Sequence, residues 1–484
     1  MSGPDEFQFI GLRQSCPAPS DWDAPGRAAL WTYNLHYFDD LNAAGATGRS
    51  EWHRALVERW IAQNPAGAGV GWEAYPLSRR VVNWIKWSLA GNTLSPGARA
   101  SLAMQARWLG QRLEYHLLGN HLFVNAKALV HAGLYFEGAE AERFLDTGLG
   151  IVERQIEEQI LADGGHFERS PMYHAAALED QLDLLNLLQA ARQPVPPSWV
   201  DLIARMQRWL DVMEHPDGEI SFFNDAALGI APRGAELRAY AARLGQALPA
   251  PSFGPLEQLP ESGYARLSCG PLSLIADCAP LGPDYLPAHG HADTLSFELS
   301  IDGRRVLVNS GTSEYGGSAE RLRQRGTAAH NTVAVDGENS SEVWGGFRVA
   351  RRARARVLTA ENGAAPALTA EHDGYSRLRG RNLHRRGWAL QPGSLRIDDE
   401  ITGRFAHAEA FFHLHPDVQV LGQPEPHRID LALGSRKLRL QFEGAAAVDV
   451  RPGTWHPCFG TSRSNHRIVA RFAGAHLGTH LAVD

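Results

Sequence analysis

The sequence predicts a two-domain α+β protein in which a helical domain, residues 1–250, precedes an antiparallel β domain, residues 251–484. Three observations support this fold class. Long amphipathic segments separated by short Gly/Pro breaks fill the first half, a proline-rich stretch interrupts the chain at 247–260, and short alternating runs with Gly and Asp turns fill the rest. Helical and strand periodicities that occupy separate parts of a chain favour segregated α and β domains.

The helical part is expected to consist of antiparallel helix hairpins. Leu178, Leu182, Leu185 and Leu188 recur at spacings of three and four residues, which places them on one face of a helix. Short connections between such segments are typical of stacked hairpins. The predicted helices span residues 51–63, 75–90, 101–118, 121–136, 141–161, 173–191 and 198–214.

The second part is expected to be an antiparallel β-sandwich. In the run SFELSIDGRRVLVNS, residues 296–310, Phe297, Leu299 and Ile301 alternate onto one face. Asp302 and Gly303 then form a typical two-residue hairpin turn. Similar short runs continue to the C-terminus, and many short strands of this kind indicate a sandwich.

The composition excludes several classes of protein. With 44% hydrophobic residues, among them 13 Trp, 18 Phe and 11 Tyr, the chain is not disordered. No run of about 18 apolar residues could span a bilayer. The net charge of −7 argues against a general binder of nucleic acid or of anionic membranes. The first residues do not resemble a signal peptide, so we expect a cytoplasmic protein by default, or a periplasmic or secreted one if a leader was removed.

The positive charge is almost entirely arginine. All but three of the 47 basic residues are Arg, and the exceptions are Lys86, Lys127 and Lys437. Because the guanidinium group forks onto carboxylate or sulfate, a local anion site is compatible with an acidic protein.

Polar side chains that could carry chemistry are concentrated in four places: residues 33–40 with 71–84, 117–132, 163–174, and 287–299 with 330–337 downstream. Each has a structural interpretation as well. Asn120 could cap a helix, Tyr173 could be a packed aromatic, and His174 could be a structural histidine. Trp72 and Tyr75 would ordinarily be core residues.

The motif HGHAD carries the strongest local signal. On an extended segment His289, His291 and Asp293 occupy alternate positions and point to one side. Imidazole and carboxylate groups clustered in this way indicate a metal or proton-transfer site. His330, in AHNT, begins a run expected in the same sheet.

Six linked pieces together resemble the heparinase II/III-like polysaccharide lyases. They are NHLFVNAKAL, DGGHFERSPMYH, SGYARL, HGHADTLSFEL, VNSGTSEY and RGTAAHNTVAVDGENSSEVWGGFRVARRA, within about residues 30–350. The resemblance implies an incomplete (α/α) toroid followed by an antiparallel β-sandwich. It also implies β-elimination on uronic-acid polysaccharides such as glycosaminoglycans, alginate or bacterial exopolysaccharides.

The resemblance assigns catalytic roles to five residues. Asn120 and His121 would neutralise the uronate carboxylate, so that negative charge can develop on removal of the C5 proton. Tyr173 could serve as base or as acid, and a base role requires nearby cations to lower its pKa from the ordinary value near 10. His289 would be the base for the other C5 stereochemistry, and Tyr315 would be a second tyrosine.

The expected substrate is an anionic polysaccharide or oligosaccharide, bound by side chains around these residues. The residues expected to bind it are Tyr37, Trp72, Tyr75, Arg79, His174, Arg321 and Arg325. The later arginines, at 348–356, are expected to form a solvated face. The sequence is compatible with a monomer or a homodimer, and it implies no organic cofactor.

The resemblance also implies a structural zinc ion held by His291, Asn309 and His330. The family usually has Asp at the position of Asn309, and a neutral amide is a weaker zinc ligand than a carboxylate. Asp293 could substitute for it, or hydrogen bonds alone could hold the group.

Two other functions stay open at this point. A glycoside hydrolase on a similar toroid would need two carboxylates flanking the bond, and Glu168, Glu179 and Asp225 are available. A non-catalytic binding or assembly protein in polysaccharide production is the other, although it would not need the residues for proton transfer.

Overall fold

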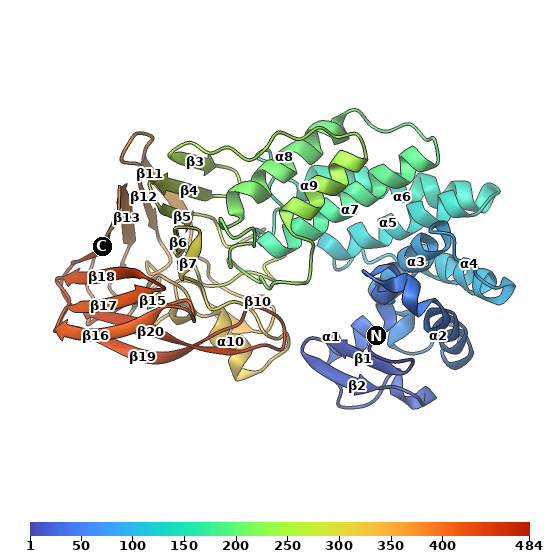
Figure 1. The fold of residues 1–484 in the computed structure, drawn as a ribbon, viewed down its shortest axis with the longest axis horizontal. Coiled ribbons are helices and arrows are strands. Elements are labelled where there is room, and N and C mark those ends of the chain that lie inside the picture. The colour runs from blue at the N-terminus through green and yellow to red at the C-terminus, as the bar shows by residue number, and fades with distance from the viewer. The chain divides into compact units, whose positions relative to one another are not determined.

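The computed structural model describes residues 1–484 (Figure 1). The chain forms two compact units, each with its own hydrophobic core. Unit 1 comprises Met1–Gln159 and Asp180–Pro196, and unit 2 comprises Ile160–Glu179 and Pro197–Asp484. The α+β fold class is confirmed, because helices dominate the N-terminal half and antiparallel strands dominate the C-terminal half.

Unit 1 begins with a short β-hairpin and continues as helices. The strands are β1 (Glu6–Phe9) and β2 (Leu12–Ser15). The helices are α1 (Ala29–Tyr37), α2 (Ser50–Gln63), α3 (Ala74–Leu89), α4 (Pro96–Gly110), α5 (Gly119–Tyr135), α6 (Ala139–Gln159) and the second half of α7 (Pro171–Ala190). Short 3₁₀ turns lie at Pro19–Asp21, Asp39–Asn42, Ala46–Arg49 and Val70–Trp72.

The pair α5 and α6 confirms the expected antiparallel hairpin. Two glycines allow the helices to approach closely. A Cβ atom on Gly133 would lie 2.6 Å from the backbone nitrogen of Leu145, and one on Gly148 would lie 2.9 Å from that of Val130. Because the later residue of α6 meets the earlier residue of α5, the two helices run in opposite directions.

The predicted helix over 101–118 is wrong at its C-terminal end, since α4 stops at Gly110. The side-chain oxygen of Asn125 accepts the backbone N–H of Glu114 at 2.9 Å, which competes with helical hydrogen bonding. Leu118, with φ of 59°, then precedes α5. Asn120 therefore lies in the first turn of α5 and does not cap it.

Unit 2 contains the first half of α7, three further helices and almost all the strands. The helices are α8 (Ser198–Met213), α9 (Gly234–Arg243) and α10 (Ala319–Arg325), with a 3₁₀ turn at Thr327–Ala329. A five-stranded sheet has the order β3 (Leu256–Leu259), β4 (Tyr264–Cys269), β5 (Leu272–Asp277), β6 (Phe297–Ile301), β7 (Arg304–Leu307). A four-stranded sheet has the order β19 (Ala447–Trp455), β20 (Arg463–Phe472), β15 (Ala408–His413), β8 (Val333–Val335).

The largest sheet has eight strands, and two further strands form a separate two-stranded sheet. The order in the large sheet is β11 (Ala355–Glu361), β12 (Ala367–His372), β13 (His384–Gln391), β14 (Ser394–Ile401), β21 (His476–Val483), β18 (Arg436–Glu443), β17 (Arg428–Leu433), β16 (Gln419–Glu425). The separate pair is β9 (Val343–Gly345) with β10 (Arg348–Val349). Neighbouring strands in these sheets pair antiparallel.

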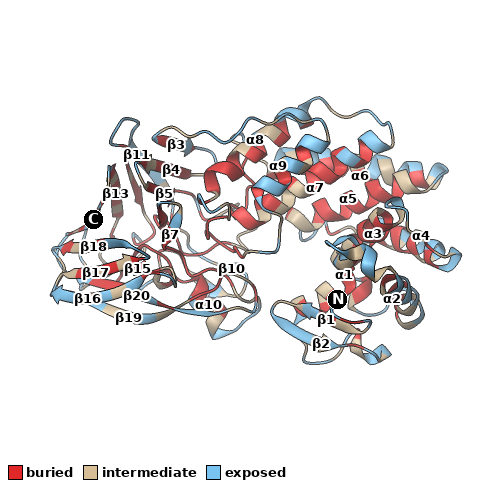
Figure 2. Ribbon diagram, in the orientation of Figure 1, coloured by how far each residue is buried: buried red, intermediate tan, exposed pale blue.

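One hydrophobic core joins the three large sheets into a sandwich. It contains Leu274 of the five-stranded sheet, Trp388 of the eight-stranded sheet and Phe412 of the four-stranded sheet, all almost fully buried. Figure 2 shows β5, one of the strands of this core, in the colour of buried residues. A single bridge joins Leu307, at the end of the edge strand β7, to Leu414, which follows β15, and so links the five- and four-stranded sheets.

The predicted hairpin at 296–310 is confirmed as β6 and β7. Asp302 and Gly303 both have positive φ, 48° and 76°, as a two-residue turn of this kind requires. Strand β6 is buried on both faces, because His215 covers its polar face and bonds Glu298 at 2.8 Å and Ser300 at 2.7 Å.

The change from helices to strands falls between Arg243, the end of α9, and Leu256, the start of β3. The compact units divide the chain differently, because residues 160–179 and the helices α8 and α9 belong with the strands. No helix is long and apolar enough to cross a bilayer.

Candidate active site

The tyrosines and histidine at the centre of the predicted chemistry come together within unit 2. The hydroxyl groups of Tyr173 and Tyr315 lie 2.8 Å apart. The imidazole of His289 packs against the ring of Tyr173 with centroids 4.1 Å apart, and it lies 5.9 Å from that of Tyr315. Residues 116 and 142 positions apart in sequence thus form one cluster, which we call the tyrosine–histidine cluster.

Tyr173 owes its position to the start of α7. Ser170 caps this turn, since its hydroxyl accepts the backbone N–H of Tyr173 at 3.2 Å and donates to the carbonyl of Asp225. Arg169, just before, has φ of 57°, a conformation that costs free energy in a non-glycine residue. Its carbonyl accepts hydrogen bonds from Tyr264 at 2.7 Å and Asn224 at 3.0 Å, which hold the strained turn.

Two apolar rings line the cluster on the side of Tyr315. Phe347 lies 5.3 Å from the Tyr315 ring and 6.2 Å from His289, and Phe459 lies 4.9 Å from Tyr315. Phe347 is 40% exposed, so it borders the surface. Neither phenylalanine was predicted, and nothing in a lone Phe of a loop would have pointed to it.

A fully buried carboxylate, Asp225, orients the histidine. Its Oδ2 accepts Nδ1–H of His289 at 2.9 Å and an N–H of Arg321 at 2.7 Å. Its Oδ1 accepts Nε2–H of His291 at 2.8 Å and the hydroxyl of Thr312 at 3.3 Å. Burial alone would raise the pKa of Asp225, but Arg321 and the two histidines hold that pKa well below its ordinary value.

The bond to an ionised Asp225 fixes the tautomer of His289. Because Nδ1–H is directed at the carboxylate, Nε2 is the ring nitrogen left to accept a proton. Only 12% of the His289 side chain is exposed. From the sequence, Asp225 was expected only as a possible hydrolase carboxylate. The signal that could have pointed to its role is the pair of histidines in HGHAD, because two buried imidazoles need an acceptor for their N–H groups.

Both phenols are protonated in the resting protein. Burial, followed by the neighbouring Tyr315 and Asp225, raises the pKa of Tyr173 well above its ordinary value. Burial and Asp225 do the same to the pKa of Tyr315, although Arg321 opposes them. None of the main influences on the pKa of Tyr173 is a cation that would favour the tyrosinate form, so the resting phenol keeps its proton.

His291, Asp293 and His330 form a buried group whose ligand atoms lie within 4.8 Å of one another and could hold a metal ion. Outer hydrogen bonds fix both imidazoles: Nε2 of His291 donates to Asp225, and Nδ1 of His330 donates to the carbonyl of Gly326 at 2.9 Å. The two remaining nitrogens face each other at 3.1 Å.

This arrangement fits a cation. Burial lowers the pKa of His291 to about 4 and that of His330 well below its ordinary value, so both rings are neutral near pH 7. Two nitrogen lone pairs then face each other, and a cation between them would turn their repulsion into coordination. Burial raises the pKa of Asp293 to about 7, and a cation beside it would favour its ionised form.

The prediction of Asn309 as a metal ligand is not supported. Its Nδ2 donates to the carbonyl of Phe222 at 2.9 Å and to Ser296 Oγ at 3.3 Å, and its Oδ1 accepts the backbone N–H of Asn331 at 3.0 Å. The amide of Asn309 therefore bonds backbone groups. The third side chain that lies with His291 and His330 is Asp293.

Arg321 and Arg325 do not offer free guanidinium groups to a substrate, which corrects the prediction. Both are fully buried. Arg321 is committed to Asp225 and to the carbonyl of Gly346 at 3.1 Å. Arg325 donates to the carbonyl of Gly290 at 2.6 Å and also to Gly345. They position the loop that carries His289.

His174 is likewise a structural residue. It is fully buried, Nδ1 accepts the backbone N–H of His166 at 3.2 Å, and Nε2 donates to the carbonyl of Met206 at 2.8 Å. Both ring nitrogens are occupied, so the predicted substrate contact is wrong. The structural interpretation of a lone histidine applies here.

A second group of predicted residues lies in unit 1. The rings of Tyr37 and Tyr75 are 5.9 Å apart, and Tyr75 packs on His121 at 4.5 Å. Arg79 lies over the Tyr37 ring at 5.6 Å. Asn120 and His121 are adjacent in the first turn of α5, and both are half-buried.

His121 is oriented in the same way as His289. Its Nδ1 bonds Oε1 of Glu114 at 3.1 Å, and Asn125 donates to the other carboxylate oxygen at 3.0 Å. Glu114 was not predicted as a site residue. Glu114 lies seven residues before His121, and the chain turns between them. A carboxylate and a histidine paired across such a turn have no characteristic spacing, so the sequence gives no signal for this pair.

Trp72 is a core residue and not part of this group. It is 5% exposed, and it packs between Trp60 and Trp108 with centroids 5.9 and 5.7 Å away. Its indole N–H donates to the carbonyl of Asn64 at 3.3 Å. The predicted contact of Trp72 with substrate is therefore not supported.

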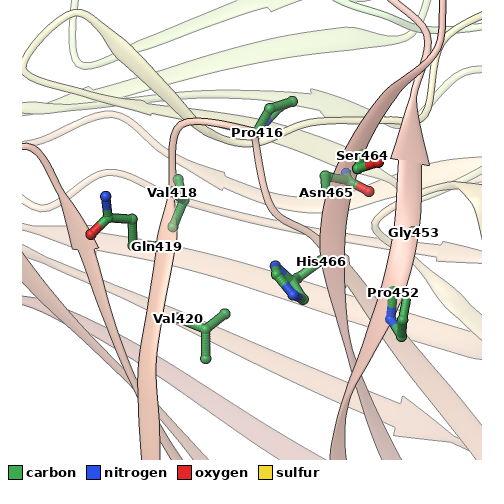
Figure 3. A pocket seen from close by; sticks show the side chains of 9 residues that line it. All are labelled: Pro416, Val418, Gln419, Val420, Pro452, Gly453, Ser464, Asn465 and His466. Atoms are coloured by element: carbon green, nitrogen blue, oxygen red, sulfur yellow. The ribbon is translucent and has the colours of Figure 1, made fainter.

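Two hollows in unit 2 lie among loops and strands. One, of about 400 Å³, includes Ser313 and Glu314 next to Tyr315. The other, of about 600 Å³, lies among β16, β19 and β20 and shares no residue with the tyrosine–histidine cluster (Figure 3). Valine, proline and amide side chains line it with His466, and it contains no carboxylate, lysine or arginine.

The chain combines helix hairpins with a β-sandwich. Its site places two phenols beside an imidazole that a carboxylate holds, and such a site is equipped for proton transfer. Residues 35–241 match the family described as Heparinase II/III N-terminus, and residues 253–482 match Heparinase II/III-like, C-terminal. The chain belongs to the heparinase II/III-like family.

The chain is similar to an FtsZ-localized protein and to heparin-sulfate lyases. FtsZ-localized protein C of Caulobacter vibrioides is 26% identical over 83% of this chain and 72% of its own length. A heparin-sulfate lyase of Bacteroides stercoris is 28% identical over 46% of this chain and 37% of its own. One of Pedobacter heparinus is 26% identical over 61% and 50%. The chain thus spans half or less of these two lyases.

Solved structures share the fold. Heparinase III matches with a TM-score of 0.78 and 19% identity, over 98% of this chain and 80% of its own. A chondroitin AC lyase of Streptomyces coelicolor matches with a TM-score of 0.61 and 12% identity, over 97% of this chain and 77% of its own. At these identities the likeness extends to the fold alone.

Proposed function

We propose that the protein is a polysaccharide lyase that cleaves a uronic-acid-containing polysaccharide by β-elimination. The observation that carries the proposal is the tyrosine–histidine cluster, in which a phenol donor and an imidazole acceptor lie side by side. Family membership and the heparin-sulfate lyases among the relatives support it.

The cluster supplies what elimination needs. Nε2 of His289 takes the C5 proton of the uronate, and the C5–H electrons form the C4=C5 double bond as the C4–O4 bond breaks. Tyr173 gives its phenolic proton to the departing O4 oxygen, and the hydroxyl of Tyr315 stabilises the resulting phenolate through the 2.8 Å hydrogen bond. The proton then returns from His289 to Tyr173, directly or through water.

The uronate carboxylate must be neutralised while C5 loses its proton. The family resemblance implies Asn120 and His121 for this role, and within unit 1 Glu114 bonds the imidazole of His121. Tyr37, Tyr75 and Arg79 would bind the sugar around them.

A binding or assembly role without catalysis is the second candidate. The observation that favours it is the FtsZ-localized relative, which matches the larger share of this chain. The combination of Tyr173, His289 and Tyr315 speaks for the lyase, because a protein that only binds has no need of a proton donor beside an acceptor.

A hydrolase is less well supported. Asp225 and Glu168 are 0% and 3% exposed, and Asp225 is committed to Arg321 and two histidines. Carboxylates so enclosed cannot flank a glycosidic bond as acid and base.

The test is a spectroscopic assay over a panel of uronate polymers. We expect a rise in near-ultraviolet absorbance from the unsaturated 4,5-uronate, with no incorporation of solvent oxygen into the new ends. Saturated products that contain solvent oxygen would contradict the lyase and favour a hydrolase. Binding on a carbohydrate array without cleavage would favour the assembly role.

We further propose Zn²⁺ as the ion for His291, Asp293 and His330, because two neutral imidazoles and a carboxylate suit it. Bound there, the ion would be structural and would hold the loop that carries His289. We expect about one zinc per chain by elemental analysis. His330→Ala should lose it, while Asn309→Ala should retain it. Equal loss from both variants would contradict this set of ligands.

A further inference from the structure

A short hairpin of unit 2, formed by β9 and β10, carries an exposed aromatic ring and an unpaired cation. Trp344 is 64% exposed, more than any other large hydrophobic side chain of the protein. Arg348 is exposed as well, and its guanidinium group forms no ion pair, whereas the nearby Arg351 pairs with Glu342. The fold uses neither Trp344 nor the charge of Arg348, and exposed apolar surface of this kind marks a binding site.

The turn of this hairpin packs on the tyrosine–histidine cluster. Phe347 lies in the turn, and its ring is 5.3 Å from that of Tyr315 and 6.2 Å from that of His289. Arg348 follows Phe347 directly, and consecutive Cα atoms are about 3.8 Å apart. The unpaired cation therefore starts beside the residues that we propose for elimination.

The hairpin is held rigidly in this position. Arg321 donates to the carbonyl of Gly346 at 3.1 Å, and Arg325 donates to the carbonyl of Gly345. A Cβ atom on Gly346 would overlap the carbonyl oxygen of Gly316, so only glycine lets the turn come this close to the segment that follows Tyr315. A surface fixed in advance loses little conformational freedom when a ligand binds.

The two exposed side chains together suit a charged sugar chain. The indole of Trp344 offers a broad, flat apolar face, which matches the C–H face of a sugar ring. The guanidinium group of Arg348 can fork onto a carboxylate or a sulfate. In a protein of net charge −7, a cation left unpaired beside a proton-transfer site points to an anionic ligand at that place.

We propose that the β9–β10 hairpin binds the polysaccharide beside the cleaved bond. Trp344 stacks on a sugar ring, and Arg348 pairs with an anionic group of a sugar other than the one that loses its C5 proton. This inference rests on the proposed lyase function. It assigns the hairpin to affinity for the chain, while proton transfer stays with Tyr173 and His289.

The test measures kcat and KM on whichever of heparosan, heparan sulfate, hyaluronan and alginate is cleaved fastest. Trp344→Ala should raise KM about tenfold, with kcat changed by no more than a factor of about three. Trp344→Phe keeps an aromatic face and should recover most of this loss. Arg348→Gln should also raise KM about tenfold, the scale of one charge pair in a partly solvated site. High salt should abolish the effect at Arg348 and leave that at Trp344.

The source of the anionic group is read from heparan sulfate and heparosan, which share a backbone but differ in sulfation. A carboxylate partner predicts that Arg348→Gln weakens the binding of both polymers. A sulfate partner predicts that it weakens the binding of heparan sulfate alone. Binding is measured by titration calorimetry in a Tyr173→Phe background, so that the polymer is not consumed.

Arg379→Gln is the matched control, since it removes an exposed arginine from the loop between β12 and β13. It should leave KM unchanged, and all these surface substitutions should change stability little. Unchanged KM in both Trp344→Ala and Arg348→Gln would overturn the inference while leaving the lyase intact. A loss confined to kcat would overturn it too, because the hairpin would then act only by positioning Tyr315. Absence of elimination on every polymer would overturn the lyase function, and this inference with it.

Discussion

Replacing Tyr173 by Phe should reduce elimination by about 10²- to 10⁴-fold, the usual contribution of a positioned proton donor. The substitution removes the phenolic proton that protonates O4 and breaks the 2.8 Å bond to Tyr315. The ring contact with His289 stays, so substrate binding and the fold should change little. The measurement is kcat from the near-ultraviolet assay, with KM from the same data.

Tyr285→Phe is the control for this variant. Tyr285 is a 54% exposed tyrosine of unit 2, and it lies outside the tyrosine–histidine cluster. Its loss of a hydroxyl should leave kcat unchanged. If Tyr173→Phe retains kcat within a factor of a few, the proton reaches O4 from another group and our assignment of the acid is wrong.

Asp225→Asn should have the second large effect, lowering kcat by about 10- to 100-fold while the protein stays folded. The amide cannot stabilise the imidazolium that forms when His289 accepts a proton. It also leaves the buried Arg321 without its carboxylate partner. Removing one member of a buried ion pair costs about 3–5 kcal/mol of folding free energy, so the assay temperature must lie below the new unfolding transition.

Asp399→Asn separates catalysis from stability. Asp399 is also a buried carboxylate, held by Arg386 at 2.7 Å and by His384 at 2.7 Å, but within the eight-stranded sheet. Both variants should lose stability to a similar degree in urea unfolding. Only Asp225→Asn should lose kcat under folding conditions, and equal losses of kcat would reduce Asp225 to a structural residue.

Much of the fold could be predicted because it depends on local sequence. Helices such as α7 follow from leucines at three- and four-residue spacing, and the turn at Asp302-Gly303 follows from residues that tolerate positive φ. The end of α4 at Gly110 could not be predicted, because it depends on Asn125, fifteen residues later, taking the N–H of Glu114.

The residue types of the site were visible in the sequence, but the hydrogen bonds and ion pairs that these residues make within the protein were not. Arg321 looks available in a sequence, and so does His174. Each is buried, and each fills its hydrogen bonds with distant groups, Arg321 with Asp225 and His174 with Met206. A sequence shows that a group can bind an anion, while only packing decides whether that group is still free to do so.

The sequence by itself determined the α+β class, the HGHAD motif and the candidate proton-transfer residues Tyr173 and His289. Tertiary structure decided which of them act together. It brought the hydroxyl of Tyr315 into hydrogen-bond distance of that of Tyr173, and it placed the carboxylate of Asp225 against Nδ1 of His289. It also gave Asp293, rather than Asn309, the third place in the metal group. The reason is physical: bond directions, burial and charge compensation arise from contacts between segments far apart in the chain.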